Sequence, residues 1–239
     1  TNSIKINLLN DIDLNGQESF WDPIIFKDNK LWINIEGNGH TIYNMKTHRK
    51  GYAAFIGSVT SNKRFIMKNL NFSNCLVFST DNRNSVVIGQ NAGKVYLENV
   101  NIKNSFVYSS SGNTGTLIGR TQTTSGNSFI RNCSSSNCYV YGTMHSGGLT
   151  GCQHNQGTYS VKYDVAFPNS PETWLNKTQI FPQMFENCYS VDCEMYSTDT
   201  EGDSGAFISC GVKMICRNCF TNNIIYGNQR TGAFFGRIT

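Results

Sequence analysis

The feature that most constrains the fold is a motif that recurs five times along the chain. In each copy an Asn is followed by a small or apolar residue, and a second Asn or Asp comes five positions after the first. The pairs are Asn69 and Asn74, Asn99 and Asn104, Asn132 and Asn137, Asn187 and Asp192, and Asn218 and Asn223. A repeat of this kind is the sequence signature of a solenoid.

A short turn of the type Gly/Ser-x-apolar-x-Gly runs in phase with the Asn pairs. It occupies residues 53–57, 85–89, 115–119, 147–151, 205–209 and 232–236, and the copies begin 32, 30, 32, 58 and 27 residues apart. The long step holds only one Asn pair. It therefore predicts one repeat that carries an inserted loop, near residues 153–182.

Between these landmarks the apolar residues alternate with period two in short runs, as in residues 4–9, 33–36 and 106–108. This pattern indicates strands, and no segment keeps a helical period beyond one turn. Strands this short bury an apolar face only when copies stack along an axis. The sequence therefore predicts one all-β domain over residues 1–239, a right-handed parallel β-helix of about seven coils. Its Asn columns should satisfy the backbone at bends and bond the same Asn one coil away.

The composition excludes several classes of protein. Charged residues make up 15% and the net charge is +4, with no basic run of the kind that binds nucleic acid. No apolar run approaches the roughly 18 residues of a membrane span, and no signal peptide opens the chain. Because the sequence begins and ends in mid-pattern, we expect a piece of a longer protein, whose flanking segments would cap the ends of the stack.

Six of the nine cysteines fall in two columns of the repeat. The first column holds Cys133, Cys188 and Cys219, and the second holds Cys75, Cys138 and Cys193. Earlier copies have Leu70 and Val100 in the first column, so Cys replaces buried apolar residues there. We expect mostly reduced, packed thiols, although disulfides between adjacent copies remain an alternative.

The predicted loop is rich in aromatic residues, including Tyr159, Tyr163 and Trp174. Insertions in repeat proteins often lie on a binding face. These three side chains are therefore the candidates for ligand binding, by stacking on sugar rings. The alternative is that they pack the loop onto the wall of the helix.

Paired carboxylates would indicate glycoside hydrolysis. The best cluster consists of Asp192, Glu194, Asp199, Glu201 and Asp203, of which the Asn column explains Asp192. Glu194, Asp199, Glu201 and Asp203 remain as the only catalytic candidates, and a solvated loop is the favoured account of the last three. The histidines have no ligand spacing, and the cysteine pairs five residues apart lie in apolar columns. We therefore expect no metal site and no cofactor.

The turn Gly147–Gly151 and its five relatives resemble the GLUG motif of large bacterial surface and secreted proteins. Residues 10–14 followed by 35–42 resemble the lead-in of such proteins. The run from Phe129 through Asn132 to the Gly-Gly-Leu turn is also similar to repeats of chlamydial polymorphic membrane proteins. These resemblances imply a right-handed parallel β-helix. They leave the function open, because such helices serve adhesins, stalks, tail spikes and polysaccharide-cleaving enzymes.

The sequence favours a non-enzymatic adhesin or stalk module, extracellular or at the cell surface, whose loop binds a glycan or a surface protein. The first alternative is a polysaccharide-degrading enzyme or phage tail-spike segment with acids and Arg131 or Arg217 on the wall. The second is a plain structural spacer.

Overall fold

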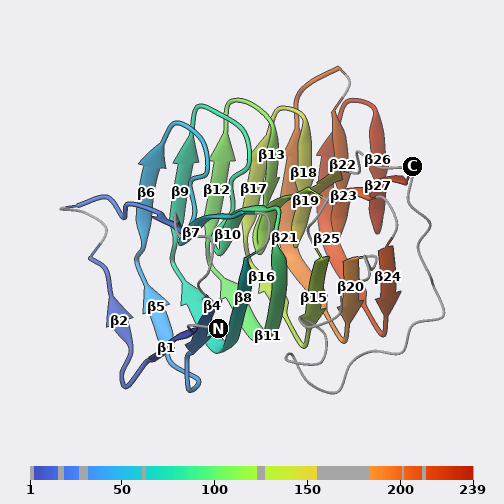
Figure 1. The fold of residues 1–239 in the computed structure, drawn as a ribbon. Coiled ribbons are helices and arrows are strands. Elements are labelled where there is room, and N and C mark those ends of the chain that lie inside the picture. The colour runs from blue at the N-terminus through green and yellow to red at the C-terminus, as the bar shows by residue number, and fades with distance from the viewer. Residues whose placement is uncertain are drawn as a thin grey trace.

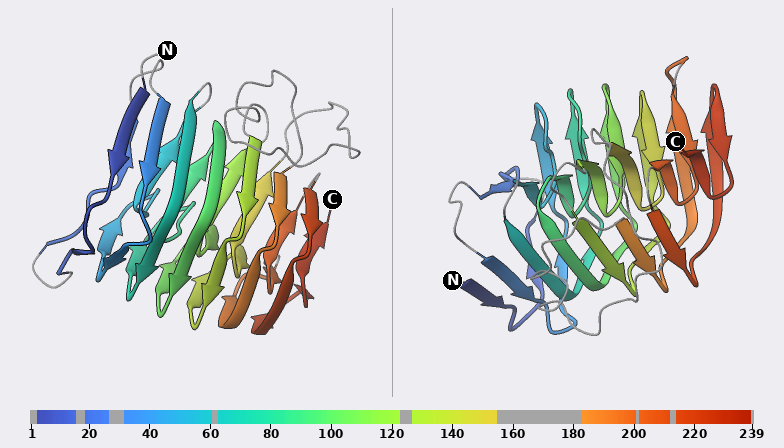
Figure 2. Two further views of the ribbon diagram at one scale, coloured as in Figure 1. Left: turned by 90° about the horizontal axis from the view of Figure 1, so that it is seen from below. Right: turned by 45° about the vertical axis from the view of Figure 1, so that its right-hand side comes forward.

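The computed structural model describes residues 3–15, 19–26, 32–60, 63–122, 127–154, 183–200, 202–211 and 214–238. These residues form 27 strands and no helix, and the strands pair in parallel as a β-solenoid of about six turns (Figure 1). The predicted parallel β-helix is therefore confirmed. The coils follow one another along the stack from the N-terminal to the C-terminal end, as the colours in Figure 2 show.

Three arms of each coil belong to one 16-stranded sheet, sheet A. The first arm holds β1 (Ser3–Asn7), β4 (Trp32–Glu36), the first part of β8 (Arg64–Ser73) and of β11 (Lys94–Lys103), β15 (Asn127–Arg131), β20 (Gln183–Glu186) and β24 (Met214–Arg217). The second arm holds β2 (Ile12–Asp13), β5 (Thr41–Tyr43), the ends of β8 and β11, β16 (Ser134–Ser136) and the first parts of β21 (Tyr189–Ser197) and β25 (Phe220–Gly227). The third arm holds β6 (Lys46–Arg49), β9 (Leu76–Ser79), β12 (Phe106–Ser109), β17 (Tyr139–Gly142) and the ends of β21 and β25.

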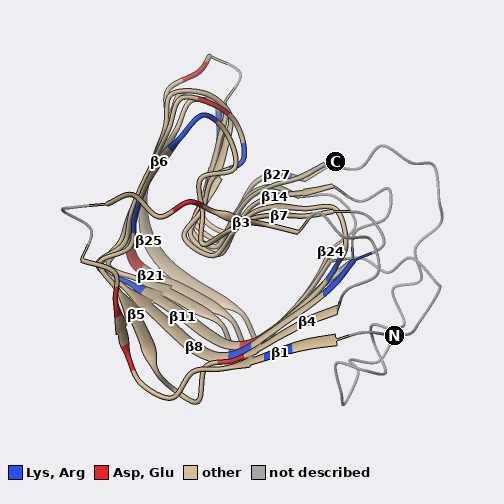
Figure 3. Ribbon diagram, turned by 60° about the vertical axis from the view of Figure 1, so that its left-hand side comes forward, with Lys and Arg blue, Asp and Glu red and all other residues tan. Residues whose placement is uncertain are grey.

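Two smaller sheets complete the stack, and the shorter of them, sheet C, has strands only from residue 113 onward. Sheet C holds β13 (Asn113–Gly115), β18 (His145–Gly147), β22 (Asp203–Gly205) and β26 (Arg230–Gly232). Sheet B holds β3 (Ile24–Ile25), β7 (Ile56–Val59), β10 (Ile88–Asn91), β14 (Ile118–Gln122), β19 (Thr150–His154), β23 (Ile208–Gly211) and β27 (Phe235–Ile238). Figure 3 looks nearly along the stack and shows the chain rising along the third arm, turning over and descending to sheet B.

The register confirms that the 58-residue step of the sequence is a single coil. Thr150 pairs with Ile208 and Cys152 with Cys210, directly across neighbouring coils. Strand β19 runs on to His154, so the inserted segment begins after residue 154 and not at 153, as the sequence suggested. Residues 155–182 lie outside the described part of the chain.

One core runs through the stack between the three sheets. Each coil contributes apolar side chains from opposite walls, such as Met67 and Leu97 from the first arm and Ile56 and Ile88 from sheet B, all without exposed surface. The nine cysteines are all free, as predicted, and seven of them are buried. Within the described residues there is no helix that is long and apolar enough to cross a membrane.

The Asn columns lie at the bends between the arms. Asn69, Asn99, Asn132, Asn187 and Asn218 have φ between 51° and 54°, the left-handed region that Asn tolerates better than most residues. Their amides form a ladder in which Asn99 donates to Asn69 at 2.7 Å, Asn187 to Asn132 at 3.1 Å and Asn218 to Asn187 at 3.2 Å. Each such Asn thus bends the chain and links two coils.

The second column differs from the sequence pattern at its last member. Asn74, Asn104, Asn137 and Asp192 all have positive φ, and Asn137 donates to Asn104 at 2.8 Å. The register between β21 and β25 shifts around Asp192, so Asn223 does not take the outward bend position. Its amide instead accepts from the Cys193 N–H at 2.9 Å and donates to the Ser190 hydroxyl at 2.8 Å. The offset of five residues alone could not show this shift, because it arises from pairing.

Candidate functional site

Several residues singled out by the sequence lie outside the described part of the chain. They are Tyr159, Tyr163, Trp174 and Glu201.

The remaining acids of the predicted catalytic cluster are not brought together. Glu194 lies on the third arm, and its carboxylate accepts a hydrogen bond from the Tyr196 hydroxyl at 2.5 Å. Asp199 lies in the following turn, where its backbone N–H donates to Thr143. Asp203 is fully buried at the start of β22 in sheet C. Glu194 and Asp203 thus lie on different sheets, so these two acids do not form a pair.

The two arginines named for a catalytic wall lie on the first arm. Arg131 forms ion pairs with Glu186 at 2.7 Å and with Glu98 at 4.0 Å, and Lys68 pairs with the same Glu98 at 3.2 Å. These side chains occupy one column and alternate in sign from coil to coil. The column therefore links neighbouring coils, and Arg131 has a structural partner on each side.

A ladder of aromatic rings runs along the outer face of the third arm. We call it the aromatic ladder; its members are Phe78, Phe106, Tyr108, Tyr139, Tyr141, Tyr196 and Tyr226. The ring centroids of Tyr108 and Tyr141 lie 5.0 Å apart and those of Tyr196 and Tyr226 4.6 Å apart, both stacked. The intervening pair, Tyr141 and Tyr196, is 6.3 Å apart. The rings form a continuous strip over five coils.

The strand period puts these rings on the outside. Val77, Val107 and Val140 are fully buried between them, so their neighbours in sequence point outward. Tyr139 is 45% exposed and Tyr226 49%. The sequence predicts a strand at residues 106–108, and the signal of the strip is the recurrence of aromatic residues at alternate positions of the successive copies. The hydrogen bond from Tyr196 to Glu194 raises the pKa of Tyr196 to about 12, so this hydroxyl stays neutral.

A second cluster lies where sheet C meets sheet B. Five coils each place one side chain at the start of the sheet C strand, or at the equivalent position just before Asn84, and another seven residues later on sheet B. The pairs are Arg83 and Gln90, Asn113 and Arg120, His145 and Cys152, Asp203 and Cys210, and Arg230 and Arg237. We call this set the polar corner. The sequence contains its signal, the offset of seven around each Gly turn, which the sequence analysis did not use.

Asp203 is the only carboxylate of the polar corner. Its oxygens lie 3.1 Å from His145 Nδ1 and 2.8 Å from Arg230 Nε, distances of ion pairs. Neither contact has the alignment of a hydrogen bond, so both oxygens are buried without one within the described residues. Burial lowers the pKa of His145, against the opposing effect of Asp203, and leaves the imidazole neutral at neutral pH.

Two thiols of the polar corner are directly paired across neighbouring coils. Cys152 and Cys210 are register partners and both are buried. A hydrogen bond between them lowers the pKa of Cys210 and raises that of Cys152. A thiol nucleophile is activated by an adjacent base or by a lowered pKa. In the described part of the chain, the imidazole of His145 makes its close polar contact with Asp203. No group of three or more His, Cys, Asp or Glu side chains among the described residues could hold a metal ion.

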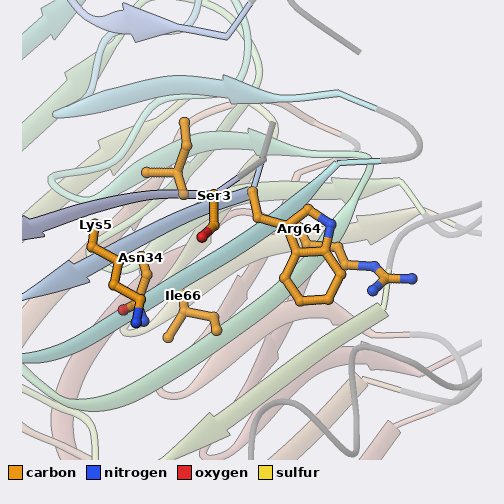
Figure 4. A pocket seen from close by; sticks show the side chains of 7 residues that line it. Ser3, Lys5, Asn34, Arg64 and Ile66 are labelled. Atoms are coloured by element: carbon orange, nitrogen blue, oxygen red, sulfur yellow. The ribbon is translucent and has the colours of Figure 1, made fainter. Parts of the chain in front are cut away.

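A pocket opens near the N-terminal end of the stack, on the outer face of the first arm (Figure 4). It measures about 220 Å³ and is lined by Ser3, Lys5, Trp32, Ile33, Asn34, Arg64 and Ile66. The Arg64 guanidinium lies over the Trp32 ring, 4.1 Å from its centroid, a cation–π contact that orders both side chains. The described residues that line this pocket include two cationic side chains, Lys5 and Arg64, and no acid.

No protein-family model and no curated protein sequence matches the chain. A solved structure from Bacteroides ovatus, named "putative immunoglobulin A1 protease", is similar with a TM-score of 0.62 and 17% sequence identity. The similarity covers 99% of this chain and 78% of that one. At this identity the likeness shows a shared β-helix fold.

Proposed function

We propose that this β-helix is a non-enzymatic module of a surface or secreted protein that binds an extended glycan along the aromatic ladder. The observation that supports it is the outward-facing strip of seven rings over five coils, of which Tyr139 and Tyr226 are exposed and the other five half-buried. Tyrosine offers both an apolar ring and a hydroxyl, which suits a ligand with apolar and hydroxylated faces. The proposal keeps the function expected from the sequence but assigns it to the third arm.

The dimensions of the strip favour a narrow ligand over a globular partner. Five coils span about 19 Å at ~4.8 Å per step, and two outward positions make it about 10 Å wide. The resulting area of roughly 200 Å² is a quarter of the ~800 Å² that each partner buries in a standard protein interface. A single polymer chain lying along the stack fits such a strip.

The test is a polysaccharide panel with the double variant Tyr141→Ser/Tyr196→Ser. We expect binding to weaken at least tenfold, because these rings lie at the centre of the strip. The matched control is Tyr189→Ser/Phe220→Ser, which removes an exposed stacked pair with centroids 5.2 Å apart on the second arm. Equal affinities for wild type and the ladder variant would refute the proposal, provided circular dichroism shows both to be folded.

The same incubation tests a hydrolytic role, the second candidate. It is favoured by the carboxylate, imidazole and thiols of the polar corner and by the name of the similar structure, so immunoglobulin A1 is included as a substrate. New reducing ends, unsaturated uronates or antibody fragments would overturn the non-enzymatic assignment. Loss of cleavage in Cys152→Ala or Cys210→Ala would then assign the chemistry to the corner.

A further inference from the structure

The polar corner carries an excess of positive charge. It contains four guanidinium groups, from Arg83, Arg120, Arg230 and Arg237, and one carboxylate, from Asp203. That carboxylate is engaged by Arg230 and lies 3.1 Å from His145. Within the described residues no acid is within ion-pair distance of Arg83, Arg120 or Arg237.

Arg83 and Arg120 lie on neighbouring coils and are both partly buried. Arg83 Nη1 donates to the Tyr52 hydroxyl and to Gln90 Oε1, both at 2.7 Å, and both acceptors are neutral. The Nε atoms of Arg83 and Arg120 are buried and have no hydrogen-bond partner in the described part of the chain. Two partly desolvated cations are thus held side by side without a counter-charge.

The energetics of Arg120 point the same way. Burial lowers the pKa of its guanidinium, and the charge of Arg83 lowers it further. Guanidinium groups remain protonated in proteins. Arg120 therefore keeps its charge, and its partial burial costs desolvation free energy in the folded state. Buried charges in proteins are normally paired with an opposite charge. The opposite charge that this arginine pair lacks within the described residues is an anion.

We propose that Arg83 and Arg120 form a binding site for a carboxylate or sulfate group of a ligand. The planar fork of a guanidinium matches these oxyanions in bidentate geometry. Gln90, which accepts from Arg83, also donates through its Nε2 to Gln122 Oε1 at 3.0 Å, so two further amide side chains lie beside the pair. The site does not rest on the aromatic ladder, because Arg120 lies on sheet B and Arg83 directly precedes Asn84, which bridges to Thr114 of sheet C.

The experiment measures thermal unfolding and calorimetric binding of the whole chain with three probes at constant ionic strength. The probes are inorganic sulfate, D-glucuronate and neutral glucose, with chloride as the reference. We expect sulfate and glucuronate to bind saturably and to raise the melting temperature, and glucose to do neither. If glucuronate binds more tightly than sulfate, the ligand of the site is an acidic sugar. If the two bind equally, the ligand is a free oxyanion.

Arg120→Gln and Arg83→Gln are measured separately, so that failure of one to fold leaves the other. Each should weaken oxyanion binding ten- to a hundredfold, as expected for loss of a charge-assisted hydrogen bond. The control Arg49→Gln removes a guanidinium that pairs with Asp22 at the surface, at 2.7 Å, and should leave binding unchanged. Absence of saturable oxyanion binding, or equal loss in the control, would overturn the proposal.

Discussion

Asn69 is a member of the Asn ladder whose side chain is hydrogen-bonded to both neighbouring coils. Its Nδ2 donates to Glu36 Oε1 at 2.9 Å, its Oδ1 accepts from Asn99 Nδ2 at 2.7 Å, and its φ is 52°. Asn69→Ala removes both hydrogen bonds, each worth about 1 kcal/mol net. It also places a less tolerant residue in the left-handed region, at a further cost of about 1 kcal/mol.

We therefore expect Asn69→Ala to lower the free energy of unfolding by about 3 kcal/mol. Asn69→Gly loses the same bonds but accepts the backbone conformation, so its loss should be about 2 kcal/mol. For a chain of this size the Ala variant should melt about 6 to 12 °C lower than wild type.

The assay is urea unfolding followed by circular dichroism, with thermal melts in parallel. Asn222→Ala is the control, because Asn222 is exposed and its φ is not positive, and it should change stability by less than about 0.5 kcal/mol. The reasoning about the backbone is refuted if the Ala and Gly variants are equally stable. The reasoning about the ladder is refuted if both match the control.

Three further predictions concern other parts of the molecule. Burial lowers the pKa of His145, so below pH ~6.5 the unfolded chain binds a proton at this residue more readily than the folded chain does. The free energy of unfolding should therefore fall as the pH drops from 7 to ~5. His145→Gln should reduce this pH dependence of the urea midpoint. Hydrogen bonds from Cys188 and Cys216 lower the pKa of the half-buried Cys219, so mass spectrometry after iodoacetamide at neutral pH should find Cys219 alkylated first. A Cβ at residue 151 would lie 2.5 Å from the Gly119 carbonyl oxygen, so Gly151→Ala should cost about 1 to 3 kcal/mol in the same urea assay.

Much of the fold follows from features that are local in sequence. The recurring Asn followed by a small or apolar residue predicts the positions at which the chain bends. The spacing between successive Gly turns, such as Gly115–Gly119, predicts the length of a coil. The cysteine columns follow equally, because Cys133 and Cys188 replace Leu and Val at fixed positions. These features recur from copy to copy, so each copy independently indicates where the chain must bend and which side chains are buried.

The candidate sites depend on pairing between coils, which no single repeat contains. Asp203 appeared in the sequence as part of an acidic loop, yet the pairing of β18 with β22 places it against His145 and buries it. Arg83 and Arg120 are 37 residues apart in sequence and become neighbours only through stacking. Asn223 shows the same dependence, because a register shift turns it inward. The coil can be predicted from the sequence alone, since its bends and strands depend on local residues. Which charges and rings meet depends on the register between neighbouring coils, and that register exists only in the folded stack.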